Sequence, residues 1–156
     1  MKIIQVVGWS QSGKTTFIKR LIPELEKKGR VAVIKHMGKH DFRLEPAKDT
    51  TLFYEAGATM SVGIDGHKTV ATQRTTSLDE VLILLSCAGI DYTIIEGFKT
   101  RAFPKIVIGD LAVDNCVASD PTVDEVLSLL PRFEDFTPDS TSEETGNKRG
   151  RPHEKR

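Results

Sequence analysis

The chain has little of several residue types, and each shortage excludes a class of protein. Its 22 acidic and 22 basic side chains cancel over 156 residues, so no net field attracts nucleic acid or a membrane surface. No apolar run is long enough to span a bilayer or to form the core of a signal peptide. We therefore expect a cytoplasmic protein whose partners include neither nucleic acid nor a membrane.

Cysteine is also scarce. Only Cys87 and Cys116 are present, and their spacing fits neither a zinc site nor a redox motif. Each thiol lies inside an apolar segment, so we expect both to be buried as small hydrophobic side chains.

The last twenty residues have no aliphatic or aromatic side chain at all. Such a segment buries too little apolar surface to offset the entropy of ordering it. We predict one folded domain over residues 1–136 and a disordered, charged tail over 137–156. The basic end of the tail is either simply solvated or a weak contact for a polyanion.

Apolar, β-branched runs alternate with segments of helical periodicity along the domain. The runs predict buried strands at 2–8, 30–36, 91–97, 105–109 and 115–119, and the periodic segments predict helices at 14–28, 49–58, 77–85 and 121–130. Residues 59–73 predict a hairpin turning at Asp65-Gly66. Ser77 and Glu80 suit a capping box, and Pro121 suits a first helical turn.

The segment "GWSQSGKT" satisfies the pattern G-x-x-x-x-G-K-[ST] between the first strand and the first helix. Glycines let backbone N–H groups turn toward phosphate oxygens, lysine reaches the outer phosphates, and the threonine hydroxyl can ligate Mg²⁺. A plain glycine turn is the alternative. We predict a triphosphate site formed by Gly8, Trp9, Ser10, Gln11, Ser12, Gly13, Lys14, Thr15 and Thr16, in a three-layer α/β P-loop fold with a mostly parallel sheet, flanking helices and a hairpin insertion.

A carboxylate is expected near the phosphate loop, because Mg²⁺ prefers oxygen ligands. Glu96 ends the apolar strand "YTIIE", so it should emerge at the carboxyl edge of the sheet, where open α/β folds bind ligands. We predict that it ligates the metal or positions water. An ordinary carboxylate at a strand end is the alternative.

Three further segments accompany the phosphate loop: "VAVIKH" with "HD" just beyond, "KDTTLFYEAGA", and "EGFK" followed by "PKI". In this combination the chain resembles the molybdopterin-guanine dinucleotide biosynthesis protein B (MobB) family over about residues 2 to 130. The resemblance implies a small, dimeric GTP-binding protein related to metallochaperone GTPases. It also implies weak Mg²⁺-dependent hydrolysis and partnership with the nucleotidyltransferase MobA, with molybdopterin or a molybdoenzyme as open further partners.

Matching by position assigns roles to residues outside the loop. The family's "KH…HD" element falls on Lys35, His36, His40 and Asp41, and its "EGFK" element on Glu96, Gly97, Phe98 and Lys99. Gln11 stands where the family more often has glycine. Asp41 would be a ligand near the metal or would position the attacking water, although the loop histidines also suit a transition metal.

Several side chains keep two interpretations. His36 and His40 would face phosphate or pterin, or else solvent, and Lys99 and Arg101 would bind an anion or remain solvated. Asp120 would read guanine or cap the helix that follows. The guanine signature N-K-x-D is absent, so GTP and Mg²⁺ as the ligands rest on the resemblance.

Two functions from other classes compete with the GTP-binding accessory protein. One is an ATP-dependent small-molecule kinase, and the other is a nucleotide-binding module that hydrolyses nothing. If hydrolysis does occur, Arg74 or Arg101 from a second subunit could act as an arginine finger.

Overall fold

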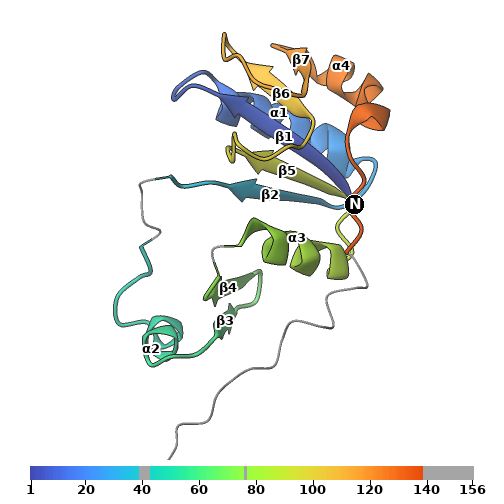
Figure 1. The fold of residues 1–156 in the computed structure, drawn as a ribbon. Helices are drawn as coiled ribbons and strands as arrows, with labels where there is room; N and C mark the ends of the chain where they lie inside the picture. Colours follow the sequence, from blue (N-terminus) through green and yellow to red (C-terminus); the bar gives the residue numbers. More distant parts are fainter. Residues whose placement is uncertain (39–42, 76, 139–156) are drawn as a thin grey trace, which may run out of the picture.

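The computed structural model describes residues 1–38, 43–75 and 77–138. Five parallel strands form the main sheet in the order β2-β5-β1-β6-β7 (Figure 1). The strands of this sheet are β1 (Lys2–Gly8), β2 (Val31–Lys35), β5 (Tyr92–Glu96), β6 (Lys105–Ile108) and β7 (Cys116–Ser119). The helices beside it are α1 (Lys14–Glu26), α3 (Leu78–Cys87) and α4 (Val123–Ser128), with a short 3-10 turn, η1, at Leu130–Arg132.

Three layers result, because both faces of the central strand β1 are covered. Its alternate residues belong to two cores: Ile4 and Val6 pack with α1 and α4, whereas Ile3 packs with α3. A strand buried on both faces reads as one continuous apolar run, which is why "KIIQVVG" shows no alternation. The predicted three-layer α/β fold is confirmed.

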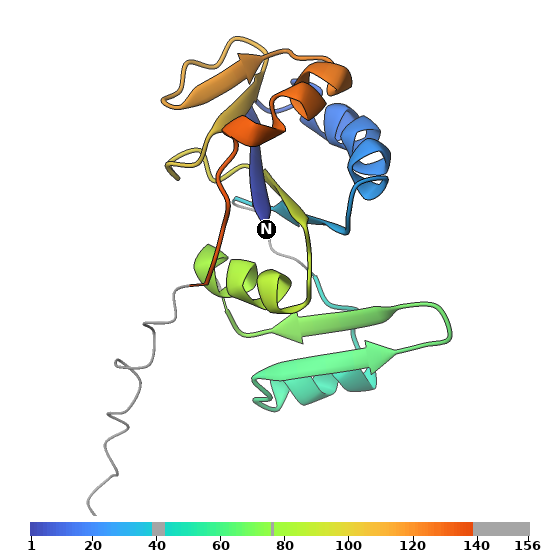
Figure 2. The ribbon, with the colours of Figure 1, turned by 90° about the vertical axis from the view of Figure 1, so that its right-hand side faces the viewer.

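The predicted hairpin is also confirmed, and it stands apart from the main sheet. Strands β3 (Met60–Ile64) and β4 (Thr69–Gln73) pair antiparallel beside α2 (Asp49–Glu55). At the turn, the Asp65 carboxylate accepts hydrogen bonds from the backbone N–H groups of His67 and Lys68 at 2.7 and 2.8 Å. Helix α3 lies between this unit and the main sheet (Figure 2).

Two local predictions are wrong. Cys87 and Cys116 are exposed thiols, because Cys87 ends α3 on its outer side and Cys116 begins the edge strand β7. Each apolar segment has one uncovered side. The thiols lie on that side.

The helix starts also differ from expectation. The Ser77 hydroxyl accepts a hydrogen bond from the N–H of Glu80, but the Glu80 carboxylate accepts one from the Thr75 hydroxyl, so only half of the capping box forms. The complete box is at Thr122 and Glu125, and Pro121 precedes the cap instead of lying in the first turn.

None of the helices in the described residues is long and apolar enough to cross a bilayer. Residues 139–156, which make up nearly all of the predicted tail, lie outside the described part of the chain.

Candidate functional site

The loop between β1 and α1 needs glycine at two places. A Cβ atom at Gly8 would lie 2.3 Å from the carbonyl oxygen of Ile108, so no larger residue fits against β6. Gly13 has φ +96°, a left-handed conformation that favours glycine. Gln11 has φ +62°, which costs a non-glycine residue roughly 1–2 kcal/mol. A left-handed backbone at this position explains why glycine would be the unstrained choice.

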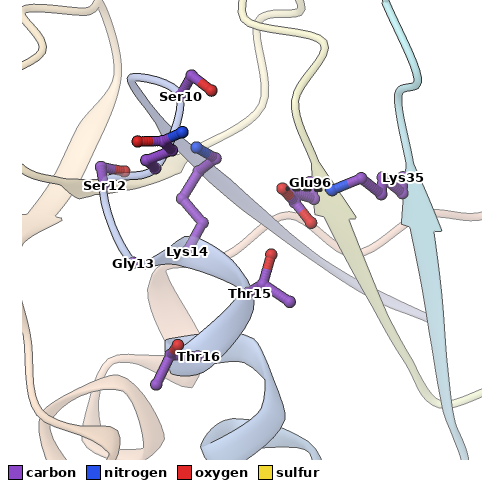
Figure 3. A pocket seen from close by; sticks show the side chains of 9 residues that line it. Ser10, Ser12, Gly13, Lys14, Thr15, Thr16, Lys35 and Glu96 are labelled. Atoms are coloured by element: carbon purple, nitrogen blue, oxygen red, sulfur yellow. Dashed lines mark hydrogen bonds and ion pairs between the residues drawn. The ribbon is translucent and has the colours of Figure 1, made fainter. Parts of the chain in front are cut away.

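The loop encloses a cavity of about 400 Å³ at the carboxyl edge of the main sheet. Figure 3 shows the loop curving around it, with Glu96 and Lys35 entering from the ends of β5 and β2. The structure therefore brings together most of the residues predicted to bind phosphate and metal. The lining residues are Ser10, Gln11, Ser12, Gly13, Lys14, Thr15, Thr16, Lys35 and Glu96.

Lys14 folds back along the loop, where its ammonium donates a hydrogen bond to the Trp9 carbonyl at 2.5 Å. Burial lowers the pKa of Lys14 below its ordinary 10.5, with Lys99 and Lys35 acting in the same direction and Glu96 opposing them. The buried Ser12 hydroxyl has no hydrogen-bond partner within the described ranges. An anion in the cavity would offer the Lys14 ammonium a charged acceptor in place of the Trp9 carbonyl, which is the chemistry expected of a phosphate site.

Glu96 forms an ion pair with Lys35, at 3.0 Å between Nζ and Oε1, and its side chain is only 12% exposed. The Thr15 hydroxyl points toward the same side of the cavity (Figure 3). A hydroxyl and a carboxylate are donors that suit Mg²⁺, which keeps most of its waters. These residues fit a magnesium ion if Lys35 gives up the carboxylate.

The alternative transition-metal site has no support in the described residues, where no three His, Cys, Asp or Glu side chains could hold an ion together. His40 and Asp41, the other candidates of the "KH…HD" element, lie outside the described residues.

Other predicted side chains lie next to the phosphate cavity instead of lining it. The His36 ring stacks on Phe98 with centroids 4.4 Å apart, and the Lys99 ammonium lies 4.6 Å from the centre of the Trp9 ring. Asp120 does not cap α4, whose cap is Thr122. Its carboxylate accepts a hydrogen bond from the Gly109 N–H at 2.8 Å.

Both arginines considered as fingers are already engaged. Arg101 forms a two-point ion pair with Asp79 of α3. Arg74 lies over the Tyr54 ring and donates to the carbonyls of Tyr54 and Ala58. Each arginine therefore stabilises its own subunit.

Two supporting residues escaped the sequence interpretation. The side-chain amide of the buried Gln5 donates hydrogen bonds to the carbonyls of Gly97 and Phe98, both at 2.7 Å. The buried Lys105 donates to the carbonyls of Arg101, Phe103 and Asp114. For Gln5 the available signal was a polar residue inside an apolar run, because burial of such a residue requires hydrogen-bond partners.

Comparisons with known proteins point to one family. Residues 3–128 match the family "Molybdopterin guanine dinucleotide synthesis protein B". A relative from Methanocaldococcus jannaschii is 39% identical over 113 residues, which cover 69% of this chain but 47% of that protein. The chain thus spans about half the length of that relative.

In other comparisons the alignment covers more of this chain and of the protein it is compared with. The molybdopterin-guanine dinucleotide biosynthesis adapter protein of Escherichia coli is 30% identical over 147 residues, or 82% of this chain and 83% of that one. The crystal structure of Bacillus subtilis MobB superposes with a TM-score of 0.65 at 26% identity, covering 83% of this chain and 98% of that chain. The resemblance noted in the sequence is confirmed. On these matches, the chain belongs to the MobB family.

Proposed function

We propose that this protein is a GTP-binding adapter in molybdenum cofactor biosynthesis, with weak Mg²⁺-dependent GTP hydrolysis. The observation that supports the proposal is the cavity where the phosphate loop meets Lys35 and Glu96 at one edge of the sheet. Membership of the MobB family supports the pathway, since the E. coli relative is an adapter protein of that pathway.

In this proposal the loop binds and orients the triphosphate. Lys14 exchanges the Trp9 carbonyl for phosphate oxygens, and the backbone N–H groups at the start of α1 face the same anion. Thr15 and Glu96 would hold Mg²⁺, which would supply charge neutralisation on the phosphates. Asp41 remains our candidate for positioning water.

Weak hydrolysis agrees with the charges around the cavity. In this proposal the Glu96 carboxylate, once released by Lys35, would ligate Mg²⁺, so it would not also orient an attacking water. The arginines that could stabilise the transition state contact their own subunit. A nucleotide state that is slow to change suits an adapter better than a catalyst.

Guanine recognition is proposed for Asp120. Its carboxylate lies at the end of β7 on the N–H of Gly109, and a Cβ at Gly109 would lie 3.7 Å from Ser12 of the loop. The carboxylate is thus next to the phosphate cavity. Its second oxygen could accept the N1 and N2 hydrogens of guanine.

We propose a homodimer that contacts the nucleotidyltransferase MobA in the cytoplasm. Support comes from the face of the hairpin turned away from α2, where Met60, Val62 and Ile64 are exposed apolar side chains on one strand. A contiguous apolar patch of this kind is typical of an interaction surface.

Trp9 fluorescence tests the function directly, because the ring lies in the loop and is 56% exposed. We expect GTP to bind more tightly than ATP in the presence of Mg²⁺, and Asp120→Ala to reduce that preference. ATP binding as tight as GTP binding would favour the kinase. Phosphate release that stays undetectable with the purified nucleotidyltransferase present would favour a module that only binds.

A further inference from the structure

Gln5 is a fully buried polar residue on the central strand, and it does not line the phosphate cavity. Its side chain lies on the face of the sheet that α3 covers, because alternate residues of a strand share a face and Ile3 packs there. From that face its Nε2 atom donates to the carbonyls of Gly97 and Phe98, both at 2.7 Å. One amide therefore holds both residues of the turn that follows β5.

The Gln5 amide is only partly satisfied by these contacts. Its Oε1 atom is buried and has no hydrogen-bond partner within the described part of the chain. A buried polar atom without a partner costs at least as much free energy as one hydrogen bond contributes. The main effect of Gln5 therefore lies in the conformation of the turn.

The turn needs such support, because its backbone is in an unfavourable conformation. Gly97 and Phe98 have φ +99° and +50°, and a left-handed backbone is uncommon for phenylalanine. Both carbonyls also point at one nitrogen atom, so their oxygens would repel each other if that donor were absent. A strained backbone persists only where the surrounding structure determines it. The Gln5 amide is the buried group that does so here.

The strained turn begins directly after Glu96, the carboxylate proposed to bind Mg²⁺. The Glu96 carbonyl accepts a hydrogen bond from the His36 N–H at 2.9 Å, and the Gly97 N–H donates to the Val6 carbonyl at 3.1 Å. Gln5 then holds the next two carbonyls along the chain. The backbone on both sides of Glu96 is thus fixed, and its carboxylate starts from one defined position.

We propose that Gln5 is a positioning residue for the proposed magnesium site: its amide holds the turn after β5 so that the Glu96 carboxylate stays on the Thr15 side of the phosphate cavity (Figure 3). The inference rests on the proposed function, in which Thr15 and Glu96 hold the ion. Mg²⁺ demands nearly ideal octahedral geometry, so a small displacement of one ligand weakens its binding. Loss of a residue that orients a metal ligand typically lowers metal affinity about 10–100-fold.

The test replaces Gln5 with methionine, which has a similar length and no N–H donor. GTP affinity of the full chain is measured by Trp9 fluorescence across a Mg²⁺ titration and again in EDTA. We expect Gln5→Met to raise the Mg²⁺ concentration at half-maximal effect by about tenfold or more, and to change GTP affinity in EDTA by less than about twofold. Thr93→Val, which removes a buried hydroxyl near the start of β5, is the matched control and should leave both values unchanged.

Hydrogen exchange of the chain without metal or nucleotide separates positioning from a general loss of stability. We expect Gln5→Met to accelerate exchange of the Gly97 and Arg101 N–H groups, whose acceptors are the carbonyls of Val6 and Phe98, and to leave exchange in β6 unchanged. Equal acceleration throughout β1 and β6 would contradict the inference. Gln5→Asn is a second variant in case methionine prevents folding. It keeps a buried amide but is one methylene too short to hold both carbonyls, so the same changes are expected.

Glu96→Gln distinguishes failure of this inference from failure of the proposed function. If Glu96→Gln needs more Mg²⁺ and Gln5→Met does not, the inference is overturned and the proposed function stands. If neither variant alters the Mg²⁺ requirement, the proposed magnesium site and the inference are both wrong. A shift in Gln5→Met alone would also overturn the inference, because the amide would then act through a group other than Glu96.

Discussion

The strands of the main sheet and those of the hairpin unit both carry apolar residues, but they bury these residues very differently. In β1 every residue after Lys2 is buried, and all four residues of β6 are buried. In β3 only Ser61 is buried, and in β4 none is, with Ile64 80% exposed at the turn. Helices cover the central strands of the sheet, whereas the hairpin leaves its outer face open.

This difference in burial suggests different roles for the sheet region and the hairpin unit. The sheet region buries its central strands between helices, and it carries the phosphate loop and its cavity. The hairpin unit has one helix on one face, which leaves the opposite face for another molecule. Changes in the first region should therefore affect ligands and folding, and changes in the second should affect assembly.

Lys14→Ala should show the largest difference between an effect on ligand binding and an effect on assembly. Without its ammonium the loop cannot neutralise the outer phosphates, so GTP affinity should fall at least a hundredfold while the fold and the oligomeric state stay unchanged. Isothermal titration and light scattering measure the two effects. Lys19→Ala, an exposed lysine on the same helix, is the control. Retained affinity in Lys14→Ala would contradict the phosphate-loop assignment.

The sequence predicted the sheet region well, because a glycine-rich loop and continuous apolar strands have few other structural solutions. It failed where a residue's environment depends on distant chain segments. Nothing near Lys105 in the sequence shows that three carbonyls from two loops converge on it. Similarly, Glu96 was predicted to ligate the metal or to position water, and its pairing with Lys35 follows only from the adjacency of β2 and β5.

A buried lysine and an exposed one should differ strongly in their contribution to stability. Lys105→Met leaves three carbonyl acceptors without their donor, which should lower the free energy of unfolding by about 2–3 kcal/mol. Lys68→Met at the hairpin turn loses one exposed ion pair and should cost less than about 0.5 kcal/mol. Urea unfolding followed by circular dichroism measures both. Equal losses of unfolding free energy in the two variants would mean that burial of Lys105 does not increase its contribution to stability.

Assembly should depend on the hairpin. Val62→Asp places a carboxylate in the middle of the exposed apolar face, and we expect it to weaken the homodimer about 30-fold without changing GTP affinity. Ala112→Asp adds the same charge to the exposed loop between β6 and β7 and should leave the dimer intact. Analytical ultracentrifugation gives the dissociation constants. A monomeric wild-type chain would remove the dimer proposal and leave the apolar face to another partner.

The smallest expected effect is a pH dependence of the unfolding free energy, which comes from Lys105 in the sheet region. Burial lowers the pKa of Lys105 below its ordinary 10.5, so between the two values the unfolded chain binds more protons than the folded one. Folded stability contributed by this group should therefore rise with pH in that interval. The difference in unfolding free energy between wild type and Lys105→Met should widen as pH is raised toward 10.5, measured by urea unfolding at several pH values. A difference that narrows instead would mean that the three carbonyls stabilise the charged ammonium more than burial penalises it.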